Sequence, residues 1–137
     1  MKYQNMTTFD LDPLLGFLTD KFVWDGTVVV CQNDKLLDRL GTPDIRLESM
    51  LVDGPLADTF TIYVRGGKPS DRVICHEFIH LMQMLRGDLK VNTKDRWFEW
   101  KGERYDASFP YNERPWEREA FARQGFWLRE YRKSIKH

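Results

Sequence analysis

Three segments of the chain carry the hydrophobic pattern of β-strands. In DTFTIYVR the apolar residues Phe60, Ile62 and Val64 alternate with other residues, which places them on one face of an extended chain. The run TVVVC is β-branched, and such side chains favour strands because they pack well on a pleated surface. We therefore predict strands over three ranges: 27–31, 44–53 and 58–65.

Apolar residues recur at helical spacing in four other segments. In the central segment, Ile74 and Phe78 fall on one face of a helix. Ser70 or Asp71 is suited to cap its start, and Gly87 is suited to end it. The other predicted helices cover the ranges 8–19, 33–41 and 112–133.

The remaining pattern is that of a hairpin. WFEWKGERYD, at 97–106, combines aromatic strand formers with a turn signal at Lys101–Gly102. No internal repeat, low-complexity tract or flexible linker interrupts the chain. The order helix, strands, central helix, hairpin, final helix predicts an α+β fold in a single domain spanning 1–137.

Composition narrows the class of protein. The 137 residues carry 21 basic and 21 acidic side chains, so the net charge of zero gives no overall attraction to nucleic acid or to a membrane surface. No segment reaches the roughly 20 apolar residues that span a bilayer, and the N-terminus lacks the apolar core of a secretion signal. Two cysteines, Cys31 and Cys75, are too few for a disulfide framework, and we expect both to be reduced and buried. These features favour a cytoplasmic protein.

The central helix carries the most specific motif. His76, Glu77 and His80 are spaced as H-E-x-x-H, and they include two of the chain's three histidines. Residues four apart lie one turn apart on the same face, so both imidazoles can bind one cation, with Glu77 beside them to take a proton from water. This is the arrangement of catalytic zinc sites. The alternative is a helix whose two histidines form ordinary hydrogen bonds.

A zinc site of this kind needs a third protein ligand. His137 is the last residue of the chain, and we expect it to be frayed, which favours a carboxylate. Glu117 and Glu119 point in different directions on the final helix, so only one of them can face the metal. Glu117 is preferred because it shares a face with Phe121, Gln124 and Leu128, and Glu119 is the next choice. Weaker options are Glu113, Glu99 and Glu103.

These residues resemble those of the zincin metallopeptidases of the glutamate-ligand kind. There, H-E-x-x-H on one helix is followed by a glutamate on a later helix. The sequence from Glu117 to Ala120 is similar to the E-x-x-A of ImmA/IrrE-type proteases, and HEFIHLMQ with YNERPWEREA resembles small uncharacterised proteins of phages and bacteria. The resemblance covers residues 73–124. One difference is Phe121, where the ImmA type has Asn or Asp, so a group orienting the zinc-bound imidazole must come from elsewhere.

The resemblance implies a fold, a site and an activity. It implies a small, mostly antiparallel sheet packed on the H-E-x-x-H helix and followed by a C-terminal helix. It also implies that the strand FTIYVR is the sheet edge over the active site. The site would hold Zn²⁺ on His76, His80 and Glu117, with Glu77 as general base in hydrolysis of a peptide or protein substrate.

Other roles follow from the chemistry of peptide hydrolysis. An oxyanion donor is needed, and Tyr111, Arg114 or Tyr105 could supply it, although a packing tyrosine and a solvated arginine are the simpler interpretations. Gln83 could bond to a ligand or to the hairpin. A rival hypothesis is a non-catalytic, phage-encoded binding or regulatory module in which the metal is structural. A metal-dependent nuclease is a further alternative, which the neutral charge disfavours.

Overall fold

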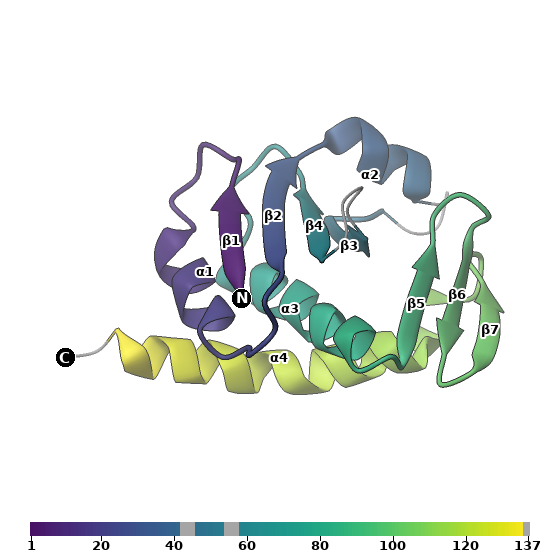
Figure 1. Ribbon diagram of the computed structural model, residues 1–137. Coiled ribbons are helices and arrows are strands. Elements are labelled where there is room, and N and C mark those ends of the chain that lie inside the picture. Colours follow the sequence, from purple (N-terminus) through teal and green to yellow (C-terminus); the bar gives the residue numbers. More distant parts are fainter. Residues whose placement is uncertain (42–45, 54–57, 136–137) are drawn as a thin grey trace.

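The computed structural model describes residues 1–41, 46–53 and 58–135, and a four-stranded sheet forms its centre (Figure 1). The strand order is β1-β2-β4-β3, in which β1, β2 and β4 run parallel and β3 is antiparallel to β4 at the edge. The strands are β1 (Lys2–Asn5), β2 (Thr27–Gln32), β3 (Ser49–Asp53) and β4 (Thr59–Val64). The first residues of the predicted strand 44–53 lie outside the described residues.

The prediction of a mostly antiparallel sheet was wrong for this sheet. Helix α1 (Asp12–Thr19) connects β1 to β2 and returns the chain to the same end of the sheet, which makes the two strands parallel. Strand β1 was missed because four residues, Lys2–Asn5, give no clear hydrophobic alternation. Helix α2 (Asp34–Leu40) follows β2, and the Asn33 side chain caps it.

The sequence FTIYVR was expected to be the edge strand over the active site, and this was also wrong. The edge strand beside the candidate site is β3. Strand β4 lies inside the sheet, where Ile62 is in register with Val30 of β2 on one side and with Leu51 of β3 on the other. The alternation of apolar residues in β4 reflects burial of the face that carries Phe60, Ile62 and Val64, and it does not distinguish an inner strand from an edge.

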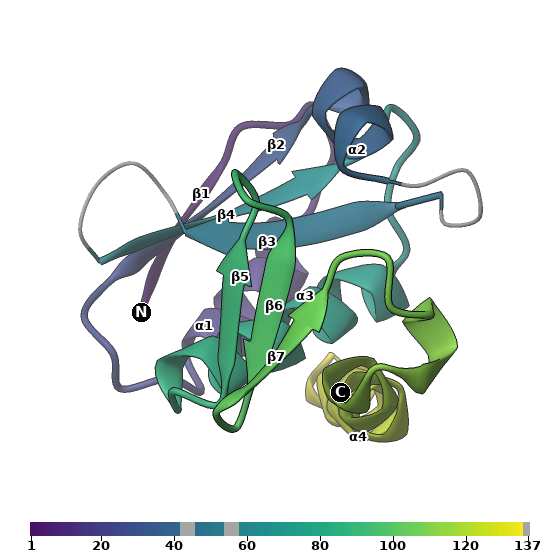
Figure 2. The same ribbon diagram turned by 90° about the vertical axis from the view of Figure 1, so that its right-hand side faces the viewer.

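Helices α1, α3 (Asp71–Leu85) and α4 (Pro115–Ser134) lie on one side of the sheet, and α2 lies beyond the other side (Figure 2). Side chains from the sheet and from α1, α3 and α4 form the main core. The core includes Leu15, Leu18, Val28, Val30, Ile62, Ile74, Phe78, Leu81 and Leu128.

Among the described residues, every helix is too short or too polar to cross a lipid bilayer.

A second, antiparallel sheet of three strands follows α3. It consists of β5 (Leu89–Asn92), β6 (Trp97–Trp100) and β7 (Glu103–Asp106). The predicted hairpin is confirmed, with Lys101 and Gly102 at positive φ in its turn, whereas β5 was not predicted. The 3-10 helix η1 (Tyr111–Glu113) then leads into α4. Four helices and two sheets confirm the α+β class.

The start of α3 gives a test of how firmly the H-E-x-x-H helix is anchored. The Ser70 hydroxyl accepts a hydrogen bond from the backbone N–H of Val73 at 3.2 Å. We expect Ser70→Ala to lower the free energy of unfolding by about 1 kcal/mol, and Ser70→Asp to leave it nearly unchanged, because aspartate also caps helices. Urea denaturation measures both, and equal losses for the two variants would contradict a capping role.

Candidate metal centre

Helix α3 brings the two histidines of the motif together. The ring centroids of His76 and His80 lie 4.7 Å apart, with an interplanar angle of 84°, and their Nε2 atoms are 3.1 Å apart. Both side chains are buried, with 7% and 6% of their surfaces exposed. The pair therefore forms a compact two-nitrogen group on the face of α3 that meets α4.

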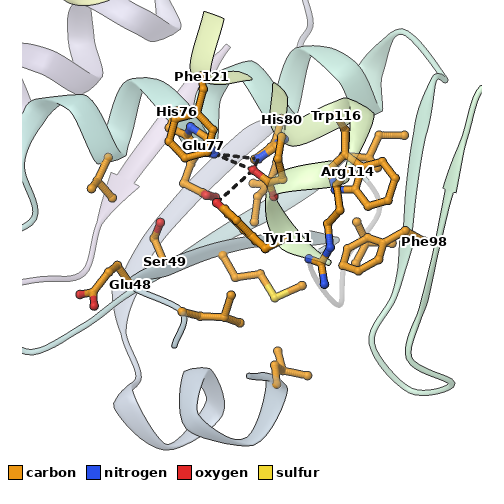
Figure 3. Close-up of a pocket in the computed structure, with 18 of the residues that line it drawn as sticks. Glu48, Ser49, His76, Glu77, His80, Phe98, Tyr111, Arg114, Trp116 and Phe121 are labelled. Carbon is orange, nitrogen blue, oxygen red and sulfur yellow. Dashed lines mark hydrogen bonds and ion pairs between the residues drawn. The ribbon is translucent and has the colours of Figure 1, made fainter. Parts of the chain in front are cut away.

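Glu117 completes this group from the first turn of α4. Its Oε1 atom lies 2.8 Å from the Nε2 of His76 and 2.9 Å from the Nε2 of His80 (Figure 3). The three side chains form a buried cluster that could hold a metal ion. The direction of Glu117 follows from the amphipathic pattern of α4, since Gln124 and Leu128 on the same face are buried as well.

The structure places the other candidate ligands away from this point. Glu119 accepts hydrogen bonds from Gln83 at 3.1 Å and from Arg86 at 3.0 Å. Glu99 pairs with Lys90, Glu103 accepts a hydrogen bond from Tyr105, and Glu113 is exposed. His137 lies outside the described residues.

Cys75 is fully buried in the main core, where burial raises the pKa of its thiol to about 12. Cys31 is only half-buried, so the prediction of a buried pair was wrong for that residue.

The proton position on His80 follows from its partner Gln83. The Nε2 of Gln83 donates to the backbone carbonyl of Trp116 at 3.0 Å and to Glu119, which leaves its Oε1 facing His80 Nδ1 at 2.7 Å. An amide oxygen only accepts hydrogen bonds, so Nδ1 carries a proton. When the ring is neutral, its Nε2 lone pair therefore points at the place where the three side chains meet.

His76 is oriented by Gln124 of α4, whose Oε1 lies 2.7 Å from its Nδ1. The Phe121 side chain cannot orient the imidazole through a hydrogen bond. The Gln124 amide, about one turn further along the same helix, does so instead. Phe121 instead lays its half-exposed ring against that of His76, with a centroid distance of 4.7 Å. Glutamines therefore hold both imidazoles with Nε2 turned inward, as outer partners of metal-bound histidines do.

The three inward atoms fit a zinc ion in chemistry and in spacing. Two imidazole nitrogens and one carboxylate oxygen are the donor set of many catalytic zinc sites. Zinc bonds of about 2.0–2.1 Å in a tetrahedral site separate ligand atoms by about 3.3 Å, and the observed separations are 2.8, 2.9 and 3.1 Å. A few tenths of an ångström of side-chain movement would accommodate the ion.

Charges in the cluster shift two pKa values in opposite directions. Burial raises the pKa of Glu117, but the neighbouring His80 charge and hydrogen bonds from both imidazoles hold it well below its usual range. Burial lowers the pKa of His80, but the Glu117 carboxylate opposes this effect and raises it to about 9. Without a metal, His80 and Glu117 therefore form an ion pair near neutral pH, in which a metal ion would replace the Nε2 proton of His80.

This ion pair predicts a pH dependence for the metal-free protein. The contribution of His80 to stability is complete below its unfolded pKa of about 6.5 and is lost as the pH rises through about 9. The contribution of Glu117 is present above about pH 4.5 and is lost as the pH falls. In urea denaturation of chelated protein, we expect stability to fall between pH 6.5 and 9, and this fall should disappear in His80→Gln. A flat profile would contradict the ion pair.

Glu77 occupies a different position from Glu117. It is 4% exposed, and its Oε2 atom has no hydrogen-bond partner among the described residues. Burial raises its pKa, although the charges of His80 and His76 and the Ser49 hydroxyl oppose that effect. A buried carboxylate with a raised pKa and an unpaired oxygen is suited to accept a proton from a group that enters the site.

Tyr111 and Arg114 are neighbours in the lining of the same cavity, with the Arg114 Cζ atom 5.5 Å from the centroid of the Tyr111 ring (Figure 3). The Tyr111 hydroxyl donates to Glu117 Oε1 at 3.1 Å, so it adjoins the point where the ligands meet. The guanidinium of Arg114 lies next to Phe98 and donates to the backbone carbonyls of Ala107 and Phe109. Of the three candidate oxyanion donors, Tyr111 therefore adjoins the ligand cluster, and Arg114 is held by the loop that precedes η1. The third, Tyr105, donates to Glu103 at 3.0 Å.

A cavity of about 470 Å³ adjoins the cluster. Its walls come from β3, α3, the second sheet and the start of α4. The two buried side-chain polar atoms without partners in the described part of the chain, Glu77 Oε2 and Trp116 Nε1, belong to residues that line it. Apolar lining residues are Leu47, Met50, Leu51, Met84, Leu89, Val91, Phe98 and Phe121.

Comparisons of the chain with protein-family models, with curated proteins and with solved structures find no match.

Gln83 was predicted to bond to a ligand or to the hairpin, and its contact with His80 can be tested. We expect Gln83→Met to lower zinc affinity by about 10- to 100-fold, because His80 loses the acceptor that fixes its ring and Nδ1 proton. Zinc titration in competition with a chelator measures the affinity. Met82→Gln, one residue along the same helix, is the control, and equal affinity for Gln83→Met and wild type would contradict the role.

Proposed function

We propose that this protein is a zinc-dependent hydrolase, most specifically a metallopeptidase, with His76, His80 and Glu117 as ligands. The observation that supports this best is the position of Glu77. A buried carboxylate with an unpaired oxygen lies beside the ligand cluster, at a cavity large enough for part of a peptide. A site that only stabilises the fold has no use for such a group.

The chain's own residues divide the work of hydrolysis. A bound zinc ion supplies a Lewis acid that polarises the attacked carbonyl and makes water more acidic. Glu77 takes the proton from the attacking water and later gives it to the leaving amine nitrogen. Burial raises its pKa in the metal-free protein, which favours its role as a proton acceptor.

Tyr111 is the residue suited to stabilise the oxygen that becomes negatively charged. Its hydroxyl stands 3.1 Å from a Glu117 oxygen, and burial followed by the charges of Glu117 and Glu77 keeps its pKa far above the usual value. The hydroxyl therefore stays protonated and remains a donor. An oxyanion donor of this kind contributes about 10²- to 10³-fold to kcat.

The choice of a peptide as substrate rests on the resemblance to zincin-type proteases and on one feature of the fold. Edge strand β3 contributes Ser49, Met50 and Leu51 to the cavity wall. An exposed strand edge can pair with an extended chain through backbone hydrogen bonds. We infer a zincin-like arrangement in which β3, α3 and α4 surround the metal.

The rival is a module in which the metal only stabilises the fold. A structural zinc site is normally closed by four protein ligands, whereas the cluster of His76, His80 and Glu117 faces a cavity. This difference favours hydrolysis.

A peptide digest tests the proposal. Zinc-loaded wild-type protein, chelated protein and zinc-loaded Glu77→Gln are incubated with a mixed peptide library, and the products are identified by mass spectrometry. We expect new termini only with the zinc-loaded wild type. A wild-type protein that holds one zinc ion and cleaves nothing would favour the structural module.

A further inference from the structure

We propose that Arg114 binds a carboxylate of the substrate, so that the cavity selects peptides with a free C-terminal or side-chain carboxylate close to the scissile bond. This inference rests on the proposed function and names the substrate class for that site. It is carried by the burial of Arg114, its lack of an acidic partner in the described chain, and its place on the cavity wall.

Arg114 is a buried cation on the wall of the cavity. It is 5% exposed and is one of the lining residues. Two of its five N–H donors bond to the Ala107 carbonyl at 2.7 Å and the Phe109 carbonyl at 3.1 Å. These bonds, and the Phe98 ring 4.7 Å from its Cζ atom, hold the planar guanidinium in place. A fixed guanidinium is suited to two parallel hydrogen bonds with a carboxylate.

No carboxylate within the described residues lies at ion-pair distance from Arg114. Glu117, whose charge acts on Arg114 without an ion pair, is already bonded to both histidines and to Tyr111. Burying a charge without a directly bonded opposite charge costs free energy. Burial lowers the pKa of Arg114, although the Glu117 carboxylate opposes this effect. An anionic ligand would relieve this cost.

Glu77 and Arg114 carry opposite charges and lie apart in the cavity lining, with Tyr111 between them (Figure 3). Glu77 would repel a second carboxylate, and Arg114 would attract it. The lining of the cavity is largely apolar. A peptide that places its carboxylate on Arg114 therefore directs a neighbouring carbonyl toward the ligand cluster.

Arg72 provides a matched control for the charge alone. It also lines the cavity, but its side chain is exposed to solvent. Arg72→Gln removes the same charge from the same cavity without removing a buried donor. Arg114→Lys keeps the charge but loses the planar fork, and Arg114→Gln loses both.

The test measures binding rather than turnover, in a Glu77→Gln background that prevents cleavage. Three probes are titrated calorimetrically: N-acetyl-Ala-Phe with a free carboxylate, its C-terminal amide, and N-acetyl-Glu-Phe amide. Each is titrated with zinc-loaded protein and with chelated protein. Because damage to the fold weakens every probe, the readout is the ratio of affinities for carboxylate and amide probes.

We expect at least one carboxylate probe to bind roughly 30-fold more tightly than the neutral amide. Arg114→Gln should abolish this ratio, Arg114→Lys should reduce it, and Arg72→Gln should leave it unchanged. Which of the two carboxylate probes is favoured distinguishes a C-terminal from a side-chain carboxylate.

Three results would overturn the inference: equal binding of all probes, a preference that survives Arg114→Gln, or a preference seen only with zinc, which would place the carboxylate on the metal. The titrations with chelated protein keep this inference separate from the proposed function. A protein that fails to bind zinc can still show the Arg114-dependent ratio, and a zinc-bound protein can still lack it.

Discussion

Glu77→Gln is expected to lower kcat for peptide hydrolysis by about 10²- to 10⁴-fold while the protein keeps its zinc. The range is the contribution that a positioned general base makes to a reaction. Glutamine matches glutamate in size, but it cannot accept a proton at this pH. The buried Oε2 of Glu77 has no hydrogen-bond partner among the described residues, so the substitution breaks no contact there that would confuse the result.

The measurement is the rate of cleavage of the best peptide from the library digest, together with zinc content by mass spectrometry. Glu48→Gln is the control, since Glu48 lines the same cavity but is exposed and pairs with Arg46. We expect the control to cleave at nearly the wild-type rate. Equal activity of Glu77→Gln and wild type would remove Glu77 from the mechanism, and loss of zinc would assign it a structural role.

Glu117→Gln is expected to weaken zinc binding by more than about 100-fold, beyond the 10- to 100-fold cost of losing a partner that only orients a ligand. The substitution replaces the single negatively charged ligand with a neutral amide. It also removes the carboxylate that contacts both imidazoles and accepts a hydrogen bond from Tyr111. Competition with a chelator of known affinity measures the change.

Glu119→Gln is the matched control, two residues away on the same helix. Its carboxylate accepts from Gln83, which remains bonded to the Trp116 carbonyl without it. We therefore expect a loss of zinc affinity below about tenfold. A larger loss for Glu119→Gln than for Glu117→Gln would exchange the roles of the two glutamates.

The local parts of the site could be predicted from the sequence because helix geometry fixes them. His76 and His80 fall on one face of any α-helix that contains them. Glu117 was preferred over Glu119 because its face continues into Gln124 and Leu128, and the structure buries that face. Periodicity thus identified the side chains that meet between α3 and α4, although the two helices are distant in sequence.

The non-local parts could not be predicted. Parallel pairing of β1 with β2 depends on a crossover through α1, and the short β1 has no pattern of its own. Gln124 was noted only as part of a buried face, because its bond to His76 requires the packing of α4 on α3. Arg114 looked like a solvated arginine, since its burial depends on the loop from Ala107 to Phe109 and on the Phe98, Tyr111 and Trp116 rings.

The central claim is that His76, His80 and Glu117 hold one zinc ion that remains accessible from the cavity. The zinc K-edge X-ray absorption spectrum of wild-type protein reconstituted with one equivalent tests it most directly. We predict a shell of nitrogen and oxygen atoms at about 2.0–2.1 Å, two imidazole rings, no sulfur near 2.3 Å, and a change when a small hydroxamate is added. Failure to retain zinc, a sulfur ligand or a third imidazole would contradict the claim.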